Sequence, residues 1–291
     1  MCPCTNAGQD PHLTLGHGGK ADFRGVNGTI YAFISSRNVS MGIRTEDATF
    51  KLGALTVHGS FMTGVYFNLR TSKGRHFHVA FDTRNVNGNG WGWRMVRTDC
   101  ARPNNSLPYH IGPHRRRECD GLVAAVEMAS LSVKHQEWAF VATAQPVYDR
   151  IAGPHHRLDV QVTLLGDERV LRPHGILGQS FDGDGRPRQG ALDVYPDKSI
   201  AAEFTTAAMA EGAIEGTAAD YALPAPRATA FAYSRFDSRD AQLPPTRGAA
   251  ARIARATDDG VDAQQAAEFR ARRLSESECP CPSPSAPPSG R

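Results

Sequence analysis

Short runs of β-forming residues, separated by turn signals, constrain the fold of this chain more than any other feature. Residues 76–81, HFHVAF, alternate so that three apolar side chains face one way and two histidines the other. Residues 158–164, LDVQVTL, alternate similarly, and TIYAFI at 29–34 and FMTGVYFNL at 61–69 are rich in β formers. The turn signals are Asn27-Gly28, Ser72-Lys73-Gly74, Asn87-Gly88-Asn89-Gly90 and Gly166-Asp167. Several short strands with turns between them predict a mainly β, antiparallel domain.

This β region covers most of the chain, and we predict one antiparallel β-sandwich-like domain over residues 5–240. Residues 122–144 fit either two strands or a strand and a helix, and we expect strands. The Ala-rich segment 201–222 is expected to hold irregular structure or a short helix. The predicted fold is therefore a single sandwich-like domain with few helices.

The two ends of the chain have a different character. Residues 1–4 form a Cys-Pro-Cys lead, and residues 241–257 are expected to be a linker. Two aspartates at 258 and 259 can cap a helix, and good helix formers follow, so we predict a short, exposed C-terminal helix over 258–278. Residues 279–291 are rich in Pro and Ser and cannot pack a core, so we expect a disordered tail.

Charge argues against some functions. The 291 residues include 33 basic and 30 acidic side chains, and this near balance lacks the electrostatic signature of a nucleic-acid-binding protein. The one basic run, Arg115-Arg116-Arg117, is followed directly by Glu118, and we interpret it as a short solvated loop. No run of eighteen apolar residues exists, so we expect no membrane span.

The six cysteines favour disulfide bonds. Cys100 and Cys119 bracket a stretch rich in Pro, Asn and Arg, which we interpret as a surface loop closed at its base by a disulfide. The other four form a Cys-Pro-Cys pair at each end of the chain and could tie the ends together or link a disulfide-bonded multimer: Cys2, Cys4, Cys279 and Cys281. Zinc is the alternative, but the spacing within each pair is shorter than structural zinc sites use.

Three Asn-x-Ser/Thr sequons, at Asn27, Asn38 and Asn104, are candidate glycosylation sites. Together with the cysteines they favour an extracellular or cell-surface location. The sequence as written begins without the basic and apolar regions of a signal peptide. The protein is therefore either a segment of a longer secreted chain or, as the alternative, cytoplasmic.

Two groups of residues could carry chemistry or binding in the strand-rich region. His76 and His78 share a strand face and could hold zinc in a metal-dependent enzyme, with a third ligand from His155, His156 or His174. A solvated face with two incidental histidines is the interpretation we prefer. Trp91 and Trp93, within NVNGNGWGW, could form one carbohydrate-stacking surface, although a buried pair beside a tight turn is the preferred alternative. Nucleophile-elbow, phosphate-loop and HExxH motifs are missing from the sequence, so we expect no enzyme.

Asp182 and Asp184 stand two residues apart in the glycine-rich stretch HGILGQSFDGDGRP, 174–187. Two such carboxylates can face one hard cation, with backbone carbonyls completing its shell, so calcium is a candidate cofactor. The spacing is not that of an EF-hand, because Asp193 rather than Glu falls at the twelfth position. A plain acidic turn is the alternative.

A family resemblance joins this stretch to the start of the chain. GQDPH at 8–12, followed by LTLG at 13–16 and FRG at 23–25, resembles the opening motif of von Willebrand factor type D-like domains. GILGQSFDG at 175–183 is similar to their later Gly-Leu-Cys-Gly-Asn-aromatic-Asp-Gly motif. The likeness covers about residues 5–240. It is closest in style to the cysteine-poor variants in root cap proteins and in the C-terminal region of inter-alpha-trypsin inhibitor heavy chains.

The resemblance implies a non-catalytic extracellular β module of matrix or cell-wall type, with a structural or adhesive role and with other extracellular proteins or polysaccharide as partners. A carbohydrate- or ligand-binding β domain is the alternative. Two departures bear on calcium: Leu177 stands where the family has a cysteine, and Gly16 where it has an aspartate that binds calcium. Asp182 matches the family's ligand set best. His12 is expected to pack or cap rather than to catalyse.

Overall fold

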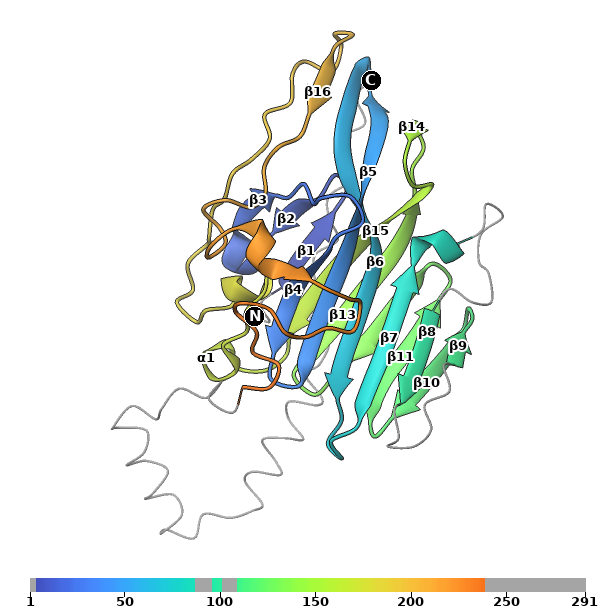
Figure 1. Cartoon of the computed structure of the whole chain (residues 1–291), viewed down its shortest axis with the longest axis vertical. Helices are drawn as coiled ribbons and strands as arrows, with labels where there is room; N and C mark the ends of the chain where they lie inside the picture. Colours follow the sequence, from blue (N-terminus) through green and yellow to red (C-terminus); the bar gives the residue numbers. More distant parts are fainter. Residues whose placement is uncertain (1–3, 87–95, 101–108, 239–291) are drawn as a thin grey trace.

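Two β-sheets packed face to face form the body of the protein in this computed structural model, which describes residues 4–86, 96–100 and 109–238 (Figure 1). The first sheet is antiparallel and has eight strands. In spatial order they are β10 (Arg115–Cys119), β11 (Leu122–Glu127), β12 (Ser130–Lys134), β13 (Trp138–Pro146), β15 (His156–Leu164), β1 (Cys4–Gly8), β2 (His12–Thr14) and β3 (Lys20–Asp22).

The second sheet has nine strands and faces the first. Its main order is β17 (Ala222–Leu223), β4 (Ile30–Ser36), β5 (Val39–Leu52), β6 (Leu55–Arg70), β7 (His76–Asp82), β8 (Val96–Cys100) and β9 (Tyr109–Ile111). Two short strands are added: β14 (Arg150–Ala152) pairs antiparallel with β5, and β16 (Glu203–Thr205) pairs in parallel with β6. The helical segments are short: α1 (Glu168–Leu171), η1 (Gly16–Gly18), η2 (Thr83–Asn85), η3 (Gly178–Ser180) and η4 (Ala218–Tyr221). The predicted mainly β, sandwich-like fold is confirmed.

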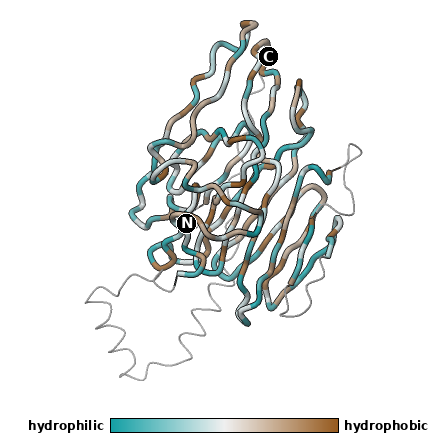
Figure 2. Tube along the Cα trace, in the orientation of Figure 1, coloured by the Kyte–Doolittle hydropathy of each residue, from teal (hydrophilic) through white to brown (hydrophobic). Residues whose placement is uncertain are grey.

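Alternation of apolar and polar residues places the core between the sheets. Phe77, Val79 and Phe81 of β7 are buried, as the alternating pattern predicts, and the same holds for the apolar positions of β15. Phe67 of β6 and Phe140 of β13 meet across the two sheets with ring centroids 5.0 Å apart. Hydropathy changes from residue to residue along these strands in Figure 2, so each strand contributes one apolar face to the core.

The β5–β6 hairpin extends beyond the sandwich. The part of the hairpin nearest its turn pairs with β14 on one side and β16 on the other, whereas the rest pairs with β4 and β7. Figure 1 shows these four strands rising together at one end of the molecule. We call this four-stranded projection, β14–β5–β6–β16, the ribbon. The predicted strand at 61–69 is shorter than β6, which begins at Leu55 and already buries Leu55 and Val57 within the ribbon.

A disulfide joins the two sheets at the other side of the molecule. Cys100 ends β8 in the second sheet and Cys119 ends β10 in the first, and their Cα atoms are 5.8 Å apart. The predicted pairing is therefore present, but its expected setting was wrong. Residues 109–111 and 115–119 are strands rather than parts of one surface loop, because β9 pairs with β8 and β10 pairs with β11. The arginine run is exposed, as expected, but it lies in a strand.

Other sequence predictions have mixed outcomes. Residues 122–144 contain β11, β12 and most of β13. Residues 201–222 hold mostly irregular structure, with the short strand β16, η4 and the first residue of β17. No helix in the described ranges is long and apolar enough to cross a membrane. Several predicted features fall outside the described residues: Cys2, Trp91 and Trp93 with their turn, Asn104, the linker at 241–257, the helix at 258–278, and the tail with Cys279 and Cys281.

Candidate functional site

A groove of about 720 Å³ lies between the opening stretch of the chain, residues 8–25, and the ribbon. Its walls come from the turn between β1 and β2, from β2 and β3, from β5 and β6 near their shared turn, and from residues 147–149 and 192–198. This volume falls in the range typical of small-ligand sites. The aromatic lining residues are Phe50, Phe61, Tyr148 and Tyr195.

Asp10 lines the groove and connects three of the segments around it. It follows Gln9, whose positive φ of 63° turns the chain between β1 and β2. The Ser60 backbone N–H donates to Asp10 Oδ1 at 3.0 Å, and the Tyr195 hydroxyl donates to Oδ2 at 2.9 Å. Burial raises the pKa of Asp10. A side chain at Gly59 would place its Cβ 2.3 Å from Asp10 Oδ1, so this approach of β6 requires glycine.

Asp22 and His12 form a second contact beside Asp10. They stand opposite each other in the β2–β3 pair, and His12 Nδ1 donates to Asp22 Oδ1 at 2.6 Å. This hydrogen bond raises the pKa of His12, although burial opposes it. The Asp193 backbone N–H donates to the other oxygen of Asp22 at 2.8 Å. Asp193 in turn accepts from the backbone of Ala207 at 2.8 Å. The opening stretch thus holds residues 193–208 against the sheet.

These contacts decide what the groove offers to a ligand. Asp10, Asp22 and Asp193 each accept hydrogen bonds from the protein itself, so they serve to position the chain. The aromatic side chains remain as contact surfaces beside the lining lysines Lys20, Lys51 and Lys198: Phe50 pairs with the buried Phe61 at 5.1 Å, and Tyr148 is 84% exposed. Apolar surfaces with a few polar groups at their margin are typical of binding sites. The arrangement is suited to non-covalent binding.

The two stretches that carry the family resemblance pack against each other. The Gly16 backbone N–H donates to Ser180 Oγ at 2.8 Å, and Ser180 Oγ donates to the Leu177 carbonyl at 2.7 Å. A Cβ at Gly16 would lie 2.4 Å from the Ser180 carbonyl oxygen, so only glycine allows this approach. Next to it, His17 Nε2 lies 3.1 Å from a carboxylate oxygen of Glu168.

Asp182 and Asp184 form an acidic turn. Arg188 donates to Asp182 Oδ2 from Nε at 3.1 Å and from Nη2 at 3.0 Å. The Asp184 backbone N–H donates to Asp182 Oδ1, and the Arg186 backbone N–H donates to Asp184. The Arg188 guanidinium therefore already pairs with the Asp182 carboxylate that a bound cation would need as a ligand. Within the described ranges no group of three or more His, Cys, Asp and Glu could hold a metal ion. From the pairing of Asp182 with Arg188 we predict that this turn does not bind calcium.

His76 and His78 lie on one face of β7, as predicted, with ring centroids 5.7 Å apart. Their Nδ1 atoms are engaged elsewhere: His76 with Asn68 Oδ1 at 2.8 Å and His78 with Asp99 Oδ1 at 2.6 Å. Burial lowers the pKa of His76. The proposed third ligands do not complete a metal-binding group in the described part of the chain: His155, His156 and His174. His174 instead stacks on Tyr233 at 4.8 Å.

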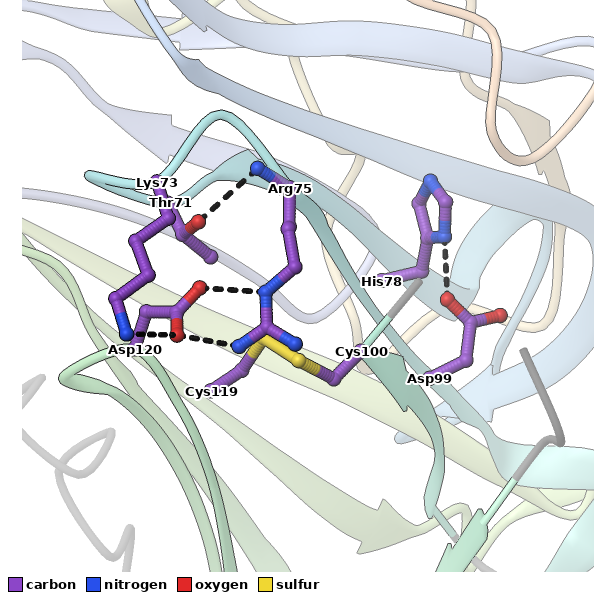
Figure 3. The surroundings of a disulfide bond; sticks show 8 residues. All are labelled: Thr71, Lys73, Arg75, His78, Asp99, Cys100, Cys119 and Asp120. Carbon is purple, nitrogen blue, oxygen red and sulfur yellow. Dashed lines mark hydrogen bonds and ion pairs between the residues drawn. A yellow bond between two sulfur atoms is a disulfide. The ribbon is translucent and has the colours of Figure 1, made fainter. Parts of the chain in front are cut away.

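Charged side chains surround the disulfide (Figure 3). Arg75 donates to both carboxylate oxygens of Asp120, the residue after Cys119, and Lys73 lies 3.7 Å from the same carboxylate. The Arg75 guanidinium lowers the pKa of Asp120 to about 2. These contacts join the β6–β7 turn of the second sheet to the β10–β11 turn of the first. The disulfide and this ion pair therefore connect the sheets at neighbouring points.

The remaining predicted sites are placed only in part. Asn27 is exposed in the turn before β4, where its side-chain carbonyl accepts from the Asp47 backbone at 3.0 Å. Asn38 is half-buried, with a φ of 66°, in the β4–β5 turn. Cys4 is disulfide-bonded. Sequence reasoning missed Asp193 and Tyr195, because nothing in LDVY at 192–195 indicates contact with residues 10 and 22.

Fold and groove together define a two-sheet β module with an inter-sheet disulfide and a candidate binding groove along a projecting ribbon. Comparison with known proteins adds no relative: no family model matches the chain, and no curated protein matches it.

Proposed function

We propose that the chain is an extracellular, non-catalytic β module of the von Willebrand factor type D-like kind, with a structural or adhesive role. The observation that carries the proposal is the contact between the two motifs of the resemblance. Gly16 and Ser180 are hydrogen-bonded although 164 residues separate them. Motifs that pack together in this way form one structural unit, as expected if they derive from one domain type.

The inter-sheet disulfide supports the extracellular setting, because structural disulfides persist in oxidising compartments. Peptide mapping of protein recovered from the medium of a secreting host should find Cys100 linked to Cys119. Recovery of both residues as free thiols from unreduced, folded protein would contradict the extracellular assignment.

The groove supports a second candidate, a carbohydrate- or ligand-binding β domain, which would also explain adhesion. Tyr148 projects from the margin of the groove, and its 84% exposure leaves the ring free to stack on the apolar face of a sugar. The carboxylates behind it are already bonded to the protein and hold the walls in place. Other extracellular proteins and neutral polysaccharide are the partners this surface fits.

Binding of defined probes to the full oxidised chain tests this function. We would immobilise the chain and measure binding of soluble neutral β-glucan and galactomannan and of a second copy of the chain. Tyr148→Ala should weaken binding at least about tenfold, as expected for a central aromatic contact. Tyr109→Ala is the matched control, because Tyr109 is an exposed tyrosine on β9, outside the groove. Equal losses in both variants would contradict the role of the groove.

A further inference from the structure

An edge strand of the first sheet carries three consecutive exposed arginines. Strand β10 pairs with β11 on one side only, and Arg115, Arg116 and Arg117 are all exposed. Arg97 is also exposed on β8, beside β9 at the corresponding edge of the second sheet. The Cys100–Cys119 bond joins β8 to β10. We call these four residues, Arg97 and Arg115 to Arg117, the arginine edge.

The strand register spreads the guanidinium groups around this edge. Arg115 and Arg117 stand opposite Val126 and Ala124, which are buried, so both arginines point toward the side of the other sheet. The Arg117 guanidinium lies over the ring of Tyr109 on β9, 5.0 Å from its centroid. Arg116 points to the opposite face, and residues on one strand face recur about every 7 Å. Strand β10 therefore presents guanidinium groups on both of its faces.

Among the residues that the structure describes, these charges have no acidic partner. None of the four arginines makes an ion pair or side-chain hydrogen bond with any residue that the structure describes. Several arginines elsewhere are paired, such as Arg75 with Asp120 and Arg188 with Asp182. The whole chain has 33 basic and 30 acidic residues, so setting aside the four arginines and Glu118 leaves 29 of each. The four arginines together with Glu118 carry a formal charge of +3, the same as the whole chain.

We propose that the arginine edge binds an anionic polysaccharide that carries sulfate or carboxylate groups. Guanidinium groups bind such oxyanions through paired hydrogen bonds, which are stronger than those between neutral groups. The preference for polysaccharide over nucleic acid rests on the proposed extracellular setting. This surface is separate from the groove, so the two can fail independently: neutral glycans and Tyr148 test the groove, and anionic glycans and the arginines test the edge.

A structural role is the competing explanation. Exposed edge strands expose unpaired backbone groups, and charged side chains on them prevent edge-to-edge association. Removal of the arginines would then cause aggregation without loss of polysaccharide binding. The experiment therefore measures binding and oligomeric state on the same samples.

Heparin is the probe, used with the full oxidised chain. The variant Arg115→Gln/Arg116→Gln/Arg117→Gln should bind heparin at least about tenfold more weakly at 0.15 M salt, because hydrogen bonds to charged groups are lost. The slope of log K against log salt should fall by about two to three, one for each contact removed. Arg115→Gln/Arg116→Gln spares the Tyr109 contact and should show most of the loss if the triple variant folds poorly.

The matched control removes three exposed arginines from other places: Arg37→Gln/Arg172→Gln/Arg186→Gln. It should bind heparin within about twofold of the parent, since its net charge change is the same but the edge is intact. Three results would each overturn the proposal. They are an equal loss of binding in both triple variants, no heparin binding by the parent, and parent-like binding by the edge triple variant while it stays monomeric. Tighter binding of a DNA duplex than of heparin, lost with the same variant, would overturn it in favour of a nucleic-acid surface.

Discussion

Two glycine-rich segments of this protein each contain a pair of aspartates, and they use them differently. In the opening stretch, Asp10 and Asp22 are buried and accept hydrogen bonds from the backbone of residues far along the chain, Ser60 and Asp193. In the later stretch, Asp182 and Asp184 bond to the backbone of their own turn. The comparison shows that the spacing of acidic residues does not reveal their role. A carboxylate that stabilises the fold is buried and bonds to a group far away in the sequence. A carboxylate that shapes only a loop is more exposed and bonds to its own turn.

The largest expected effect comes from breaking the opening stretch at Asp10. Asp10→Ala leaves the Ser60 N–H and the Tyr195 hydroxyl without their acceptor in a buried place. We expect a loss of about 3 kcal/mol in the free energy of unfolding, measured by urea denaturation. Asp10→Asn, which keeps one acceptor oxygen, should lose less. If Asp10→Ala lowers the free energy of unfolding by less than about 1 kcal/mol, the opening stretch does not stabilise the fold more than the later stretch does.

The contact between the two stretches can be broken at Gly16. Gly16→Ala would bring its Cβ within 2.4 Å of the Ser180 carbonyl oxygen, so the two segments must separate. Overpacking of this kind should cost about 2 kcal/mol in the free energy of unfolding. Denaturant unfolding followed by intrinsic fluorescence measures it. An unchanged midpoint would mean that the segments do not pack as described.

A smaller effect should appear as a pH dependence in the opening stretch. The bond to Asp22 raises the pKa of His12 above its ordinary value, so folding favours the charged imidazolium. The stability from this pair is fully present below about pH 6.5 and is lost as pH rises through the higher pKa of the folded state. Because His12 is half-exposed, we expect less than about 1 kcal/mol.

Unfolding curves between pH 6 and 9 for the parent and for His12→Gln measure this step. The fall in stability should be present in the parent and absent in the variant. A parent whose stability rises over this interval, with the rise removed by His12→Gln, would contradict the His12–Asp22 contact.

The smallest effect is expected in the later stretch. Asp182→Ala removes a partly exposed pair with Arg188 and one turn hydrogen bond. The free energy of unfolding should change by no more than about 0.5 kcal/mol, the usual value for such a pair. Urea denaturation under the conditions used for Asp10→Ala gives the direct contrast. A loss as large as that of Asp10→Ala would show that both segments hold the fold.

The sheet structure was largely predictable because burial on one strand face imposes a period of two on the sequence. The apolar positions of β7 and β15 show this period, and both strands were found within a residue or two. The same reasoning failed for β10, where Arg115 to Arg117 are exposed on both faces and no apolar face marks the strand. It also shortened β6, because the prediction began at Phe61 although Leu55 and Val57 are buried and alternate with the half-buried Thr56 and His58.

Only the groove residues from the opening stretch of the chain could be predicted as candidate site residues. Asp10, His12 and the stretch around Asp22 stood out by composition, but their partners Ser60, Asp193 and Tyr195 occur in ordinary sequence contexts. Residues 22 and 193 meet only because residues 191–208 cross the first strands, a long-range arrangement that local patterns do not encode. Conversely, Asp182 and Asp184 had a motif and a family resemblance, yet Arg188, four residues beyond Asp184, supplies the positive charge there.

The effect of calcium on thermal unfolding tests this division between the two segments most directly. Any ligand that binds the folded state must raise the unfolding midpoint. With the oxidised full chain, we predict the same midpoint in millimolar calcium and in chelator, for the parent and for Asp182→Ala, and a low midpoint for Asp10→Ala in both. A midpoint that rises with calcium in the parent and not in Asp182→Ala would contradict the account, because the later stretch would then be a cation site.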